Sequence, residues 1–429
     1  MNATVPAMSE TLLALVFVLL LIAPLAVAGV ALINTGLGRS RSAAQALLGN
    51  LAMVAVAAVF FAVIGATIAG NLSGTGFSFY AAGKPWNWLG AGSLFLHGMG
   101  SATPQAQLEL LFEFLAVSMV VLIPWGSGAD RWRLAGGCAA AAVVAGVLFP
   151  LFAHWIWGGG WLGQLGANFG LGAGFLDVGG AAAVHLFGGL SALVLLWIVG
   201  PRSGKFPKEG LSTAMPGHHA VAVLFGCLLA LIGWTAWNAA GAILWLHAPL
   251  TALPETAINT LLSASAALAA TFAVTRARFG KPDASLCANG WLAGLVTSSA
   301  CAALAPAIGA IFAGAVAGLF TPLLVELLEL ALSVDDPSGA ITVHGAAGLW
   351  GLLMAGLFAP KPGQFMAQLV GIAALLGLAL PLLYLFFALL NRVVEFRADA
   401  DGERLGMDLY ELGGSAYPEF VIHRDDSYR

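Results

Sequence analysis

Two histidines, His185 and His344, lie at matching positions in two apolar segments of the chain. When the sequence is shifted by 159 residues, residues 180–193 fall on residues 339–352, and seven of the fourteen aligned pairs are identical. The same shift places Asp177 on Asp336, eight residues before each histidine. Two facing imidazoles can share a proton, one nitrogen donating and the other accepting. The repeat therefore predicts a paired histidine site in which an acid precedes each ring.

Membrane helices are the elements that must position these residues. Of the 429 residues, 60% are hydrophobic and only 9% are charged, whereas a soluble domain has about 25% charged residues. One membrane span takes ~20 apolar residues. Apolar stretches of about that length occur at 11–34, 46–70, 104–124, 134–156, 178–200, 217–247, 254–275, 286–304, 307–332, 340–359 and 364–391. We therefore expect an all-α polytopic membrane protein with eleven transmembrane helices over 1–391 and a charged cytoplasmic tail over 392–429.

The spacing of the repeat and the distribution of charge predict the topology. Each repeat unit holds five spans, and because five is odd, the two copies must lie in opposite orientations. This predicts a 5+5 inverted repeat plus an eleventh helix, with the site at the repeat interface. Fifteen of the 17 lysines and arginines fall on one side of the expected membrane. The positive-inside rule then places the C-terminus in the cytoplasm and the N-terminus outside the inner membrane.

Several classes of site and partner are not expected. The net charge of −4 gives no reason to expect nucleic acid as a partner. No CxxC pair occurs, so neither a zinc site nor a redox pair is indicated. No basic residue lies within a span, which argues against a voltage sensor or an arginine-lined anion pore. We expect no cofactor, no metal and no enzyme activity.

The two histidines should meet near the middle of the membrane. Eight helical residues advance ~12 Å, and half the hydrocarbon core is ~15 Å thick. The fifth span starts outside near Asp177 and the tenth starts inside near Asp336, so His185 and His344 approach the midplane from opposite faces. Glycine and alanine beside them allow close helix approach. Two core histidines bonded to backbone carbonyls are the alternative, although ionisable residues inside membranes are usually functional.

Other side chains near the outer mouth have two possible roles. Asp177 can cap the start of the fifth span, or its charge can help to hold a cation. Trp157, Trp237 and either Phe112 or Phe114 lie in the outer halves of their spans. They are either interfacial belt residues or ring faces offered to a small cation.

At these residues the chain resembles the ammonium transporter/Rhesus (Amt/Rh) family, over nearly its whole length. The most specific segments are AHWIWGGGWL (153–162), FLDVGGAAAVH (175–185), GWTAWNAA (233–240) and VDDPSGAITVHG (334–345). The resemblance implies a homotrimer with a separate pore through each protomer. It also implies that His185 and His344 line the pore, that Asp177 is the structural acid, and that Trp157 recruits the cation outside.

Several positions depart from the family pattern. Trp237 stands where the family usually has a gate phenylalanine, and Gly241 stands where many bacterial members have a cation-holding serine. A gap-free alignment from AlaAspArg (129–131) gives Phe112 the outer aromatic position, and places Glu113 on a usual glutamine and Ala116 on the other gate phenylalanine. A two-residue gap would place Phe114 at that gate instead, and both alignments stay open.

The tail carries a modified form of the family's cytoplasmic motif. GMDLYELGGSAY (406–417) keeps the Gly-x-Asp-Leu core and the terminal tyrosine. Leu412 and Gly414 replace a typical histidine and glutamate, which weakens the expectation of a PII-type regulatory partner.

We therefore expect transport of ammonium or ammonia across the inner membrane through a twin-histidine pore. A bare ammonium ion would lose many kcal/mol of hydration in a lipid-walled pore, so the cation should be captured and deprotonated outside. One alternative is an ammonium sensor signalling through the tail at 392–429, which the altered gate, Gly241 and the acidic Glu113 motivate. Another alternative is a Rhesus-like channel for ammonia gas.

Overall fold

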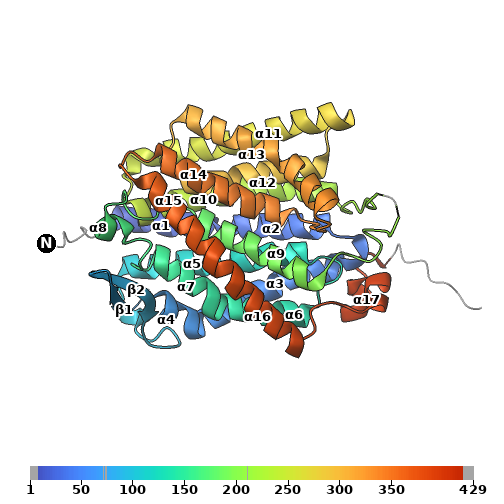
Figure 1. The fold of residues 1–429 in the computed structure, drawn as a ribbon, viewed down its shortest axis with the longest axis horizontal. Helices are drawn as coiled ribbons and strands as arrows, with labels where there is room; N and C mark the ends of the chain where they lie inside the picture. Colours follow the sequence, from blue (N-terminus) through green and yellow to red (C-terminus); the bar gives the residue numbers. More distant parts are fainter. Residues whose placement is uncertain (1–7, 71, 73–74, 210, 419–429) are drawn as a thin grey trace, which may run out of the picture.

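The computed structural model describes residues 8–70, 72, 75–209 and 211–418. Within this part of the chain, ten helices are long and apolar enough to cross a membrane. They lie side by side along one long axis (Figure 1). The prediction of an all-α polytopic membrane protein is therefore confirmed.

The described part of the chain contains the following helices, and a π turn adjoins several of them. The first half holds α1 (Glu10–Ile22), α2 (Pro24–Leu37), α3 (Ala43–Phe60), η2 (Phe61–Gly65), α4 (Ala66–Ala69), α5 (Pro104–Ser127), α6 (Leu134–Val143), η4 (Val144–Leu148), α7 (Phe149–Ile156), α8 (Leu165–Phe169), η5 (Ala181–Leu186) and α9 (Phe187–Val199). The second half holds α10 (Ala220–Leu246), α11 (Leu253–Phe279), α12 (Ala284–Cys301), α13 (Ala307–Glu326), η7 (Leu327–Ala331), η8 (Ile341–Ala346), α14 (Ala347–Phe358), α15 (Gln364–Ala374), η9 (Leu375–Ala379) and α16 (Leu380–Val393). The tail adds α17 (Ala400–Leu405) and η10 (Asp408–Leu412), and short 3₁₀ turns occur at η1 (Ser40–Ser42), η3 (Met99–Ser101) and η6 (Leu250–Ala252).

The segment expected as the eighth span, 286–304, forms α12. This 18-residue helix packs against α10, α11, α13 and α14. Its serine and threonine residues make it less apolar than the ten helices counted above. An eleventh membrane span therefore stays a prediction.

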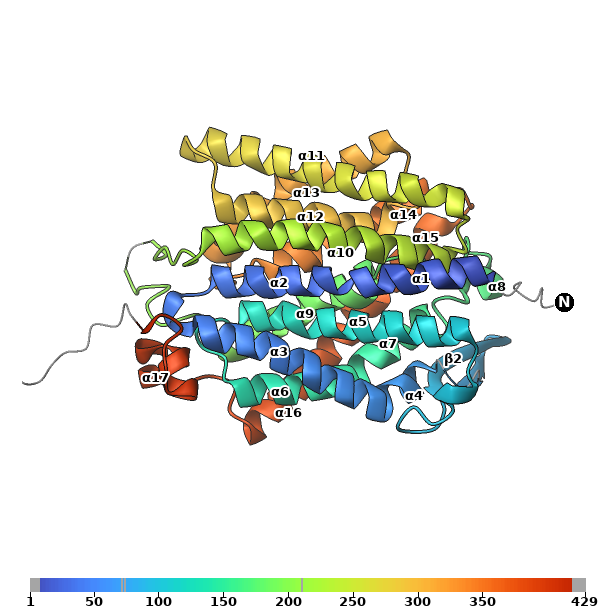
Figure 2. The same cartoon turned by 180° about the vertical axis from the view of Figure 1, so that it is seen from behind.

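A β-hairpin, which the sequence pattern did not indicate, interrupts the loop after the second span. Strand β1 (Thr75–Ala81) pairs antiparallel with β2 (Lys84–Ala91), and the register shifts between Phe77 and Ser78. The hairpin lies beside α4 at one end of the bundle, and α17 lies at the opposite end (Figure 2). We call these the hairpin end and the tail end.

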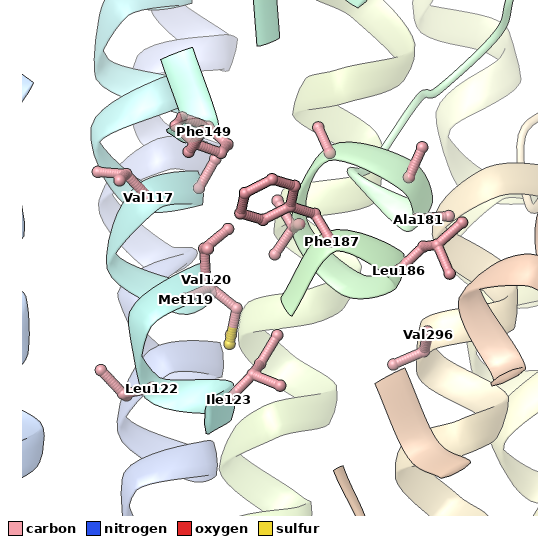
Figure 3. Close-up of a cluster of buried hydrophobic side chains, with 14 of the residues drawn as sticks. Val117, Met119, Val120, Leu122, Ile123, Phe149, Ala181, Leu186, Phe187 and Val296 are labelled. Atoms are coloured by element: carbon pink, nitrogen blue, oxygen red, sulfur yellow. The ribbon is translucent and has the colours of Figure 1, made fainter. Parts of the chain in front are cut away.

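The centre of the bundle is a continuous apolar core. Figure 3 shows Phe187, the first residue of α9, beside the α5 side chains Val120 and Ile123. All three side chains are buried. This packing fixes the segment that carries His185 against α5.

The loops at the tail end are joined by buried ion pairs. Arg202 donates from Nε and its backbone N–H to one oxygen of Asp335 at 2.9 and 2.8 Å, and from Nη2 to the other oxygen at 2.8 Å. Its Nη1 lies 3.1 Å from Asp130, while Arg131 lies 3.7 Å from Asp335. Burial raises the pKa of the Asp335 carboxyl, but the hydrogen bonds from Arg202 and the charges of both arginines outweigh it and lower the pKa to about 2.

The tail binds to this same end through helix capping. Asp408 accepts hydrogen bonds from the backbone N–H groups of Gln45 and Ala44 at 2.7 and 3.2 Å, at the start of α3. Glu411 accepts from the backbone N–H of Leu134, the first residue of α6, at 3.0 Å. A carboxylate at a helix N-terminus satisfies free N–H groups and faces the positive end of the dipole. The tail therefore completes two membrane helices.

Replacing Asp335 should destabilise the protein in a pH-dependent way. Its folded pKa of about 2 lies below the ordinary 3.8, so ionised Asp335 contributes about 2.5 kcal/mol, at ~1.4 kcal/mol per pKa unit. The contribution is complete above about pH 4 and is lost as the pH falls toward 2. Asp335→Asn should lower the thermal midpoint in detergent at pH 7 and flatten the acid side of the stability curve.

The matched control for this substitution is Asp401→Asn, which removes an exposed partner of Arg404. Exposed pairs contribute little, so this variant should melt close to the parent. Equal midpoints for the Asp335→Asn variant and the parent at pH 7 would contradict the assigned role of the buried pairs.

Candidate functional site

His185 and His344 are in direct contact at the centre of the bundle. Their Nδ1 atoms lie 3.2 Å apart, within hydrogen-bond distance. The ring centroids are 5.2 Å apart with 23° between the planes, and both residues are buried. One Nδ1 must donate and the other accept, so one ring carries its proton on Nδ1 and the other on Nε2. The neutral pair therefore offers one Nε2 acceptor and one Nε2–H donor to its surroundings.

Each histidine lies in a π turn that begins a membrane helix. His185 belongs to η5 and His344 to η8, and π turns often occur at functional positions. Just after His185, Gly189 of α9 meets Gly345 of η8, and a Cβ on Gly189 would overlap the backbone of Gly345. The absence of a side chain at this contact allows the two imidazoles to meet. The histidine pair expected from the internal repeat is thus present in the structure.

A tryptophan covers one face of His185. The Trp234 ring stacks on His185 with a centroid distance of 5.0 Å and 14° between the planes. Its Nε1 donates to Ser299 Oγ at 2.7 Å, which fixes the indole. The stacking on Trp234 and the Nδ1 contact with His344 therefore both restrict rotation of the His185 ring.

Asp177 and Asp336 bind the starts of the two π turns. Asp177 Oδ2 accepts from the backbone N–H groups of Ala182 and Ala183 at 3.0 and 2.9 Å. Asp336 Oδ2 accepts from the N–H of Ile341 at 2.9 Å. The pseudo-symmetry breaks at the other oxygen of each acid. Asp336 Oδ1 accepts from Ser127 Oγ at 2.8 Å, whereas Asp177 Oδ1 is buried without a hydrogen-bond partner among the described residues.

Four aromatic side chains from α5, α10 and the end of α7 pack against one another next to a cavity at the hairpin end. Phe112 lies at their centre, with its ring 5.4 Å from Trp157, 5.1 Å from Trp237 and 5.7 Å from Trp245. Trp157 and Trp245 stack on each other at 5.4 Å with 8° between the planes. Phe112 is fully buried. We call this set, Phe112, Trp157, Trp237 and Trp245, the aromatic plug.

The ring contacts distinguish Phe112 from Phe114. Phe114 packs edge-on against Phe61 at 5.0 Å, on another face of α5. Residues two apart on a helix point in different directions. Phe112 is therefore the α5 phenylalanine that lies beside Trp237.

A cavity of about 290 Å³ opens above the aromatic plug at the hairpin end. Trp157, Asp177 and Trp245 line it, together with Glu109 and His247. Glu113 is fully buried and is not one of the lining residues. The structure thus places Glu109, rather than Glu113, on the cavity.

A second cavity, of about 590 Å³, lies at the tail end. Asp335, Asp336, Arg202, Lys205 and Glu329 are among its lining residues. Asp177 borders the first cavity and Asp336 the second, and each precedes its histidine by eight residues. The histidine pair therefore lies between two cavities that open toward opposite ends of the bundle.

Gly241 allows α10 to approach the segment before η5. A Cβ at this position would overlap the carbonyl oxygen of Val178 and would lie 3.5 Å from the Phe112 ring. The backbone itself therefore fills the place where a serine side chain would stand.

Trp234, Trp245 and Glu109 are not among the site residues predicted from the sequence. For Trp245 and Glu109, the helical spacing in the sequence indicates a position near the predicted site. Trp245 follows Trp237 by eight residues and Gly241 by four, which places all three on one face of α10. Glu109 precedes Phe112 by three residues and shares its face, whereas Glu113 is rotated by about 100° from Phe112. The stacking of Trp234 on His185 depends on how α10 packs against η5, and this packing could not be predicted from the sequence.

Comparison with known proteins gives a consistent result. A family model described as "Ammonium Transporter Family" matches residues 12–417. "Ammonium transporter Amt2" of Archaeoglobus fulgidus is 31% identical over 416 residues, covering 92% of this chain and 85% of that protein. "Ammonium transporter Amt2" of Haloferax mediterranei is 29% identical, covering 92% and 87%.

Solved structures share the fold. One described as "Sensor Amt Protein" superposes with a TM-score of 0.84 at 24% identity, covering 93% of this chain and 98% of that chain. The Rh50 protein of Nitrosomonas europaea superposes with a TM-score of 0.70 at 21% identity, covering 96% and 95%.

Gly241→Ser should destabilise the protein, because the added side chain displaces the backbone at Val178. We expect a lower thermal midpoint in detergent and a lower yield of folded protein. The control is Gly377→Ser in η9, where an added Cβ meets nothing within 4 Å. A Gly241→Ser variant that melts with the parent would show that the site accommodates the hydroxyl.

Proposed function

The chain belongs to the ammonium transporter family, and from this membership we propose that it moves ammonium or ammonia across the membrane by way of His185 and His344. The observation that carries the proposal is the histidine pair, joined at 3.2 Å between two oppositely facing cavities. An uncharged pair of imidazoles offers hydrogen bonds to a small polar molecule inside a largely apolar bundle. It offers no fixed negative charge to replace the hydration of a cation.

The proposed mechanism begins with capture of the cation in the hairpin-end cavity. Carboxylates and indole faces line this cavity, and both attract cations. The aromatic plug then separates the cavity from the histidines. A cation crossing it would lose its hydration at a cost of many kcal/mol, so deprotonation before the plug lets neutral ammonia pass. The proton returns outside or travels by the histidine pair.

Three expectations on assembly and orientation belong to this proposal. The tail end is cytoplasmic and the hairpin end faces outward, which the concentration of arginine and lysine on one side supports. The protein lies in the inner membrane and acts as a homotrimer with one path through each protomer.

The tail is proposed as the regulatory element. Asp408 and Glu411 tie it to the starts of α3 and α6, so a partner that moved the tail would affect two membrane helices. A PII-type protein is the proposed partner, with weakened affinity because Leu412 and Gly414 replace two polar residues of the usual motif.

A second candidate function is an ammonium sensor that signals through the tail. The buried position of Phe112 within the aromatic plug favours it, because a closed plug suits binding with little flux. Ammonium-evoked currents on supported membranes separate the two functions, and a potassium control reports selectivity. Sustained current indicates transport, binding without sustained current indicates a sensor, and ammonia permeation without charge movement indicates a gas channel.

His185→Ala should abolish ammonium conduction or its selectivity over potassium. The substitution removes one partner of the central hydrogen bond and leaves a space beside Trp234. Proteoliposome currents in ammonium and in potassium provide the measurement, and size-exclusion chromatography checks that the variant is folded. His218→Ala serves as the control, since His218 is remote from the pair and bonds Gly38 and Tyr417. Unchanged current and selectivity in His185→Ala would overturn the proposed path.

Asp177→Asn should keep much of the activity, whereas Asp177→Ala should lose both stability and transport. An amide oxygen can still accept the backbone hydrogen bonds from Ala182 and Ala183, and alanine cannot. Thermal midpoints and ammonium currents of both variants measure this difference. If both variants fold like the parent yet conduct nothing, the charge of Asp177, rather than its capping bonds, is what transport requires.

A further inference from the structure

Glu109 is the acid of the hairpin-end cavity that keeps contact with water. It lies on α5, one turn before Phe112, and lines the cavity together with Trp157 and Trp245. Its side chain is partly exposed. One carboxylate oxygen accepts a hydrogen bond from Gln105 Nε2 at 2.9 Å. This bond orients the carboxylate and leaves its other oxygen for a ligand.

The other acids near the plug are placed differently. Asp177 is buried, and its Oδ2 holds the start of η5. Glu113 is buried and does not line the cavity. No lysine or arginine occurs among the described residues that line the cavity, and His247 is the basic group there. An arriving cation therefore meets Glu109 as the accessible negative charge.

The aromatic walls complement this charge. Trp157 and Trp245 stack on each other at 5.4 Å and border the same cavity as Glu109. Indole rings attract cations within about 6 Å of the ring centre, and a carboxylate forms charge-assisted hydrogen bonds with an N–H cation. The cavity volume of about 290 Å³ is several times the ~30 Å³ that one water occupies in the liquid. An ammonium ion can therefore enter with part of its hydration shell.

We propose that Glu109 is a cation-binding residue of this protein, holding a partly hydrated ammonium ion against the indole walls before the ion reaches Phe112. This inference rests on the proposed function and deepens it by naming the charge that recruits the substrate. The ion binds where it keeps some water, and it must lose the rest only at the aromatic plug.

Glu109→Gln is the direct test. The amide oxygen can still accept the hydrogen bond from Gln105, so the substitution removes charge and little else. We expect the apparent Kd for ammonium, measured by calorimetry in detergent or from the concentration dependence of currents, to rise about 5–10-fold, which corresponds to ~1–1.4 kcal/mol. The difference from the parent should shrink at high salt, because salt screens partly exposed charges.

Glu255→Gln is the matched control. Glu255 is exposed at the start of α11, on the same end of the bundle, but lines a separate cavity. Glu255→Gln removes the same charge as Glu109→Gln but does not change the hairpin-end cavity, so it should leave the Kd for ammonium unchanged. An equal effect of both substitutions would assign the change to the overall field of the outer face and overturn the specific role of Glu109.

Two further outcomes separate this inference from the proposed function. If the parent neither binds nor conducts ammonium, the proposed function fails. If the parent binds ammonium and Glu109→Gln binds it equally well, only the inference fails. Should Glu109→Gln not fold, Glu109→Asp provides the test: it keeps the charge but shortens the reach, and a Kd equal to that of the parent would contradict direct contact with the ion.

Discussion

The hydrogen bond between the two buried imidazoles is the interaction on which the rest of the structure depends. A polar ring buried in an apolar bundle is costly unless its nitrogens find partners. Here the partner of His185 is His344, which arrives from the other half of the chain. To bring them together, two helices must begin close to the middle of the bundle, approach from opposite ends and meet without intervening side chains. The π turns, the Gly189–Gly345 contact and the two capping acids each satisfy one part of that requirement.

An aspartate caps the start of a π turn at each end of the bundle, but the groups around the two aspartates differ. At the tail end, Asp336 uses both oxygens in protein hydrogen bonds, and the neighbouring Asp335 is neutralised by arginines. At the hairpin end, Asp177 uses one oxygen for capping and borders a cavity lined by indoles and a second acid. Negative charge is thus compensated within the protein at one end and left available to a ligand at the other. The proposed capture of a cation at the hairpin end depends on this asymmetry.

Much of this arrangement could be predicted from the sequence, because hydropathy and the internal repeat are both visible in the order of the residues. Helix bounds such as Leu134–Ile156 agree with the expected stretch 134–156, and the shift of 159 residues identified both members of the histidine pair. Contacts between segments that the repeat does not relate could not be predicted. The role of Trp245 follows from its stacking on Trp157, and that of Gly241 from its close approach to Val178, and both contacts depend on how the helices pack. The β-hairpin is not part of an apolar stretch, so the hydropathy pattern did not predict it.

In the proposed mechanism, the position of the negative charge relative to the aromatic plug matters more than its amount. A carboxylate beyond the plug would have to hold a fully dehydrated cation, and the energy gained from one ion pair does not offset that loss when both partners are buried. On the cavity side, the proposed site would bind an ion that keeps part of its hydration, so the pair would cost little to form. Phe112 and the three indoles mark the boundary between these two regimes. The acids that serve capture therefore belong above the plug, and the uncharged imidazoles, which can hydrogen-bond a neutral molecule, belong below it.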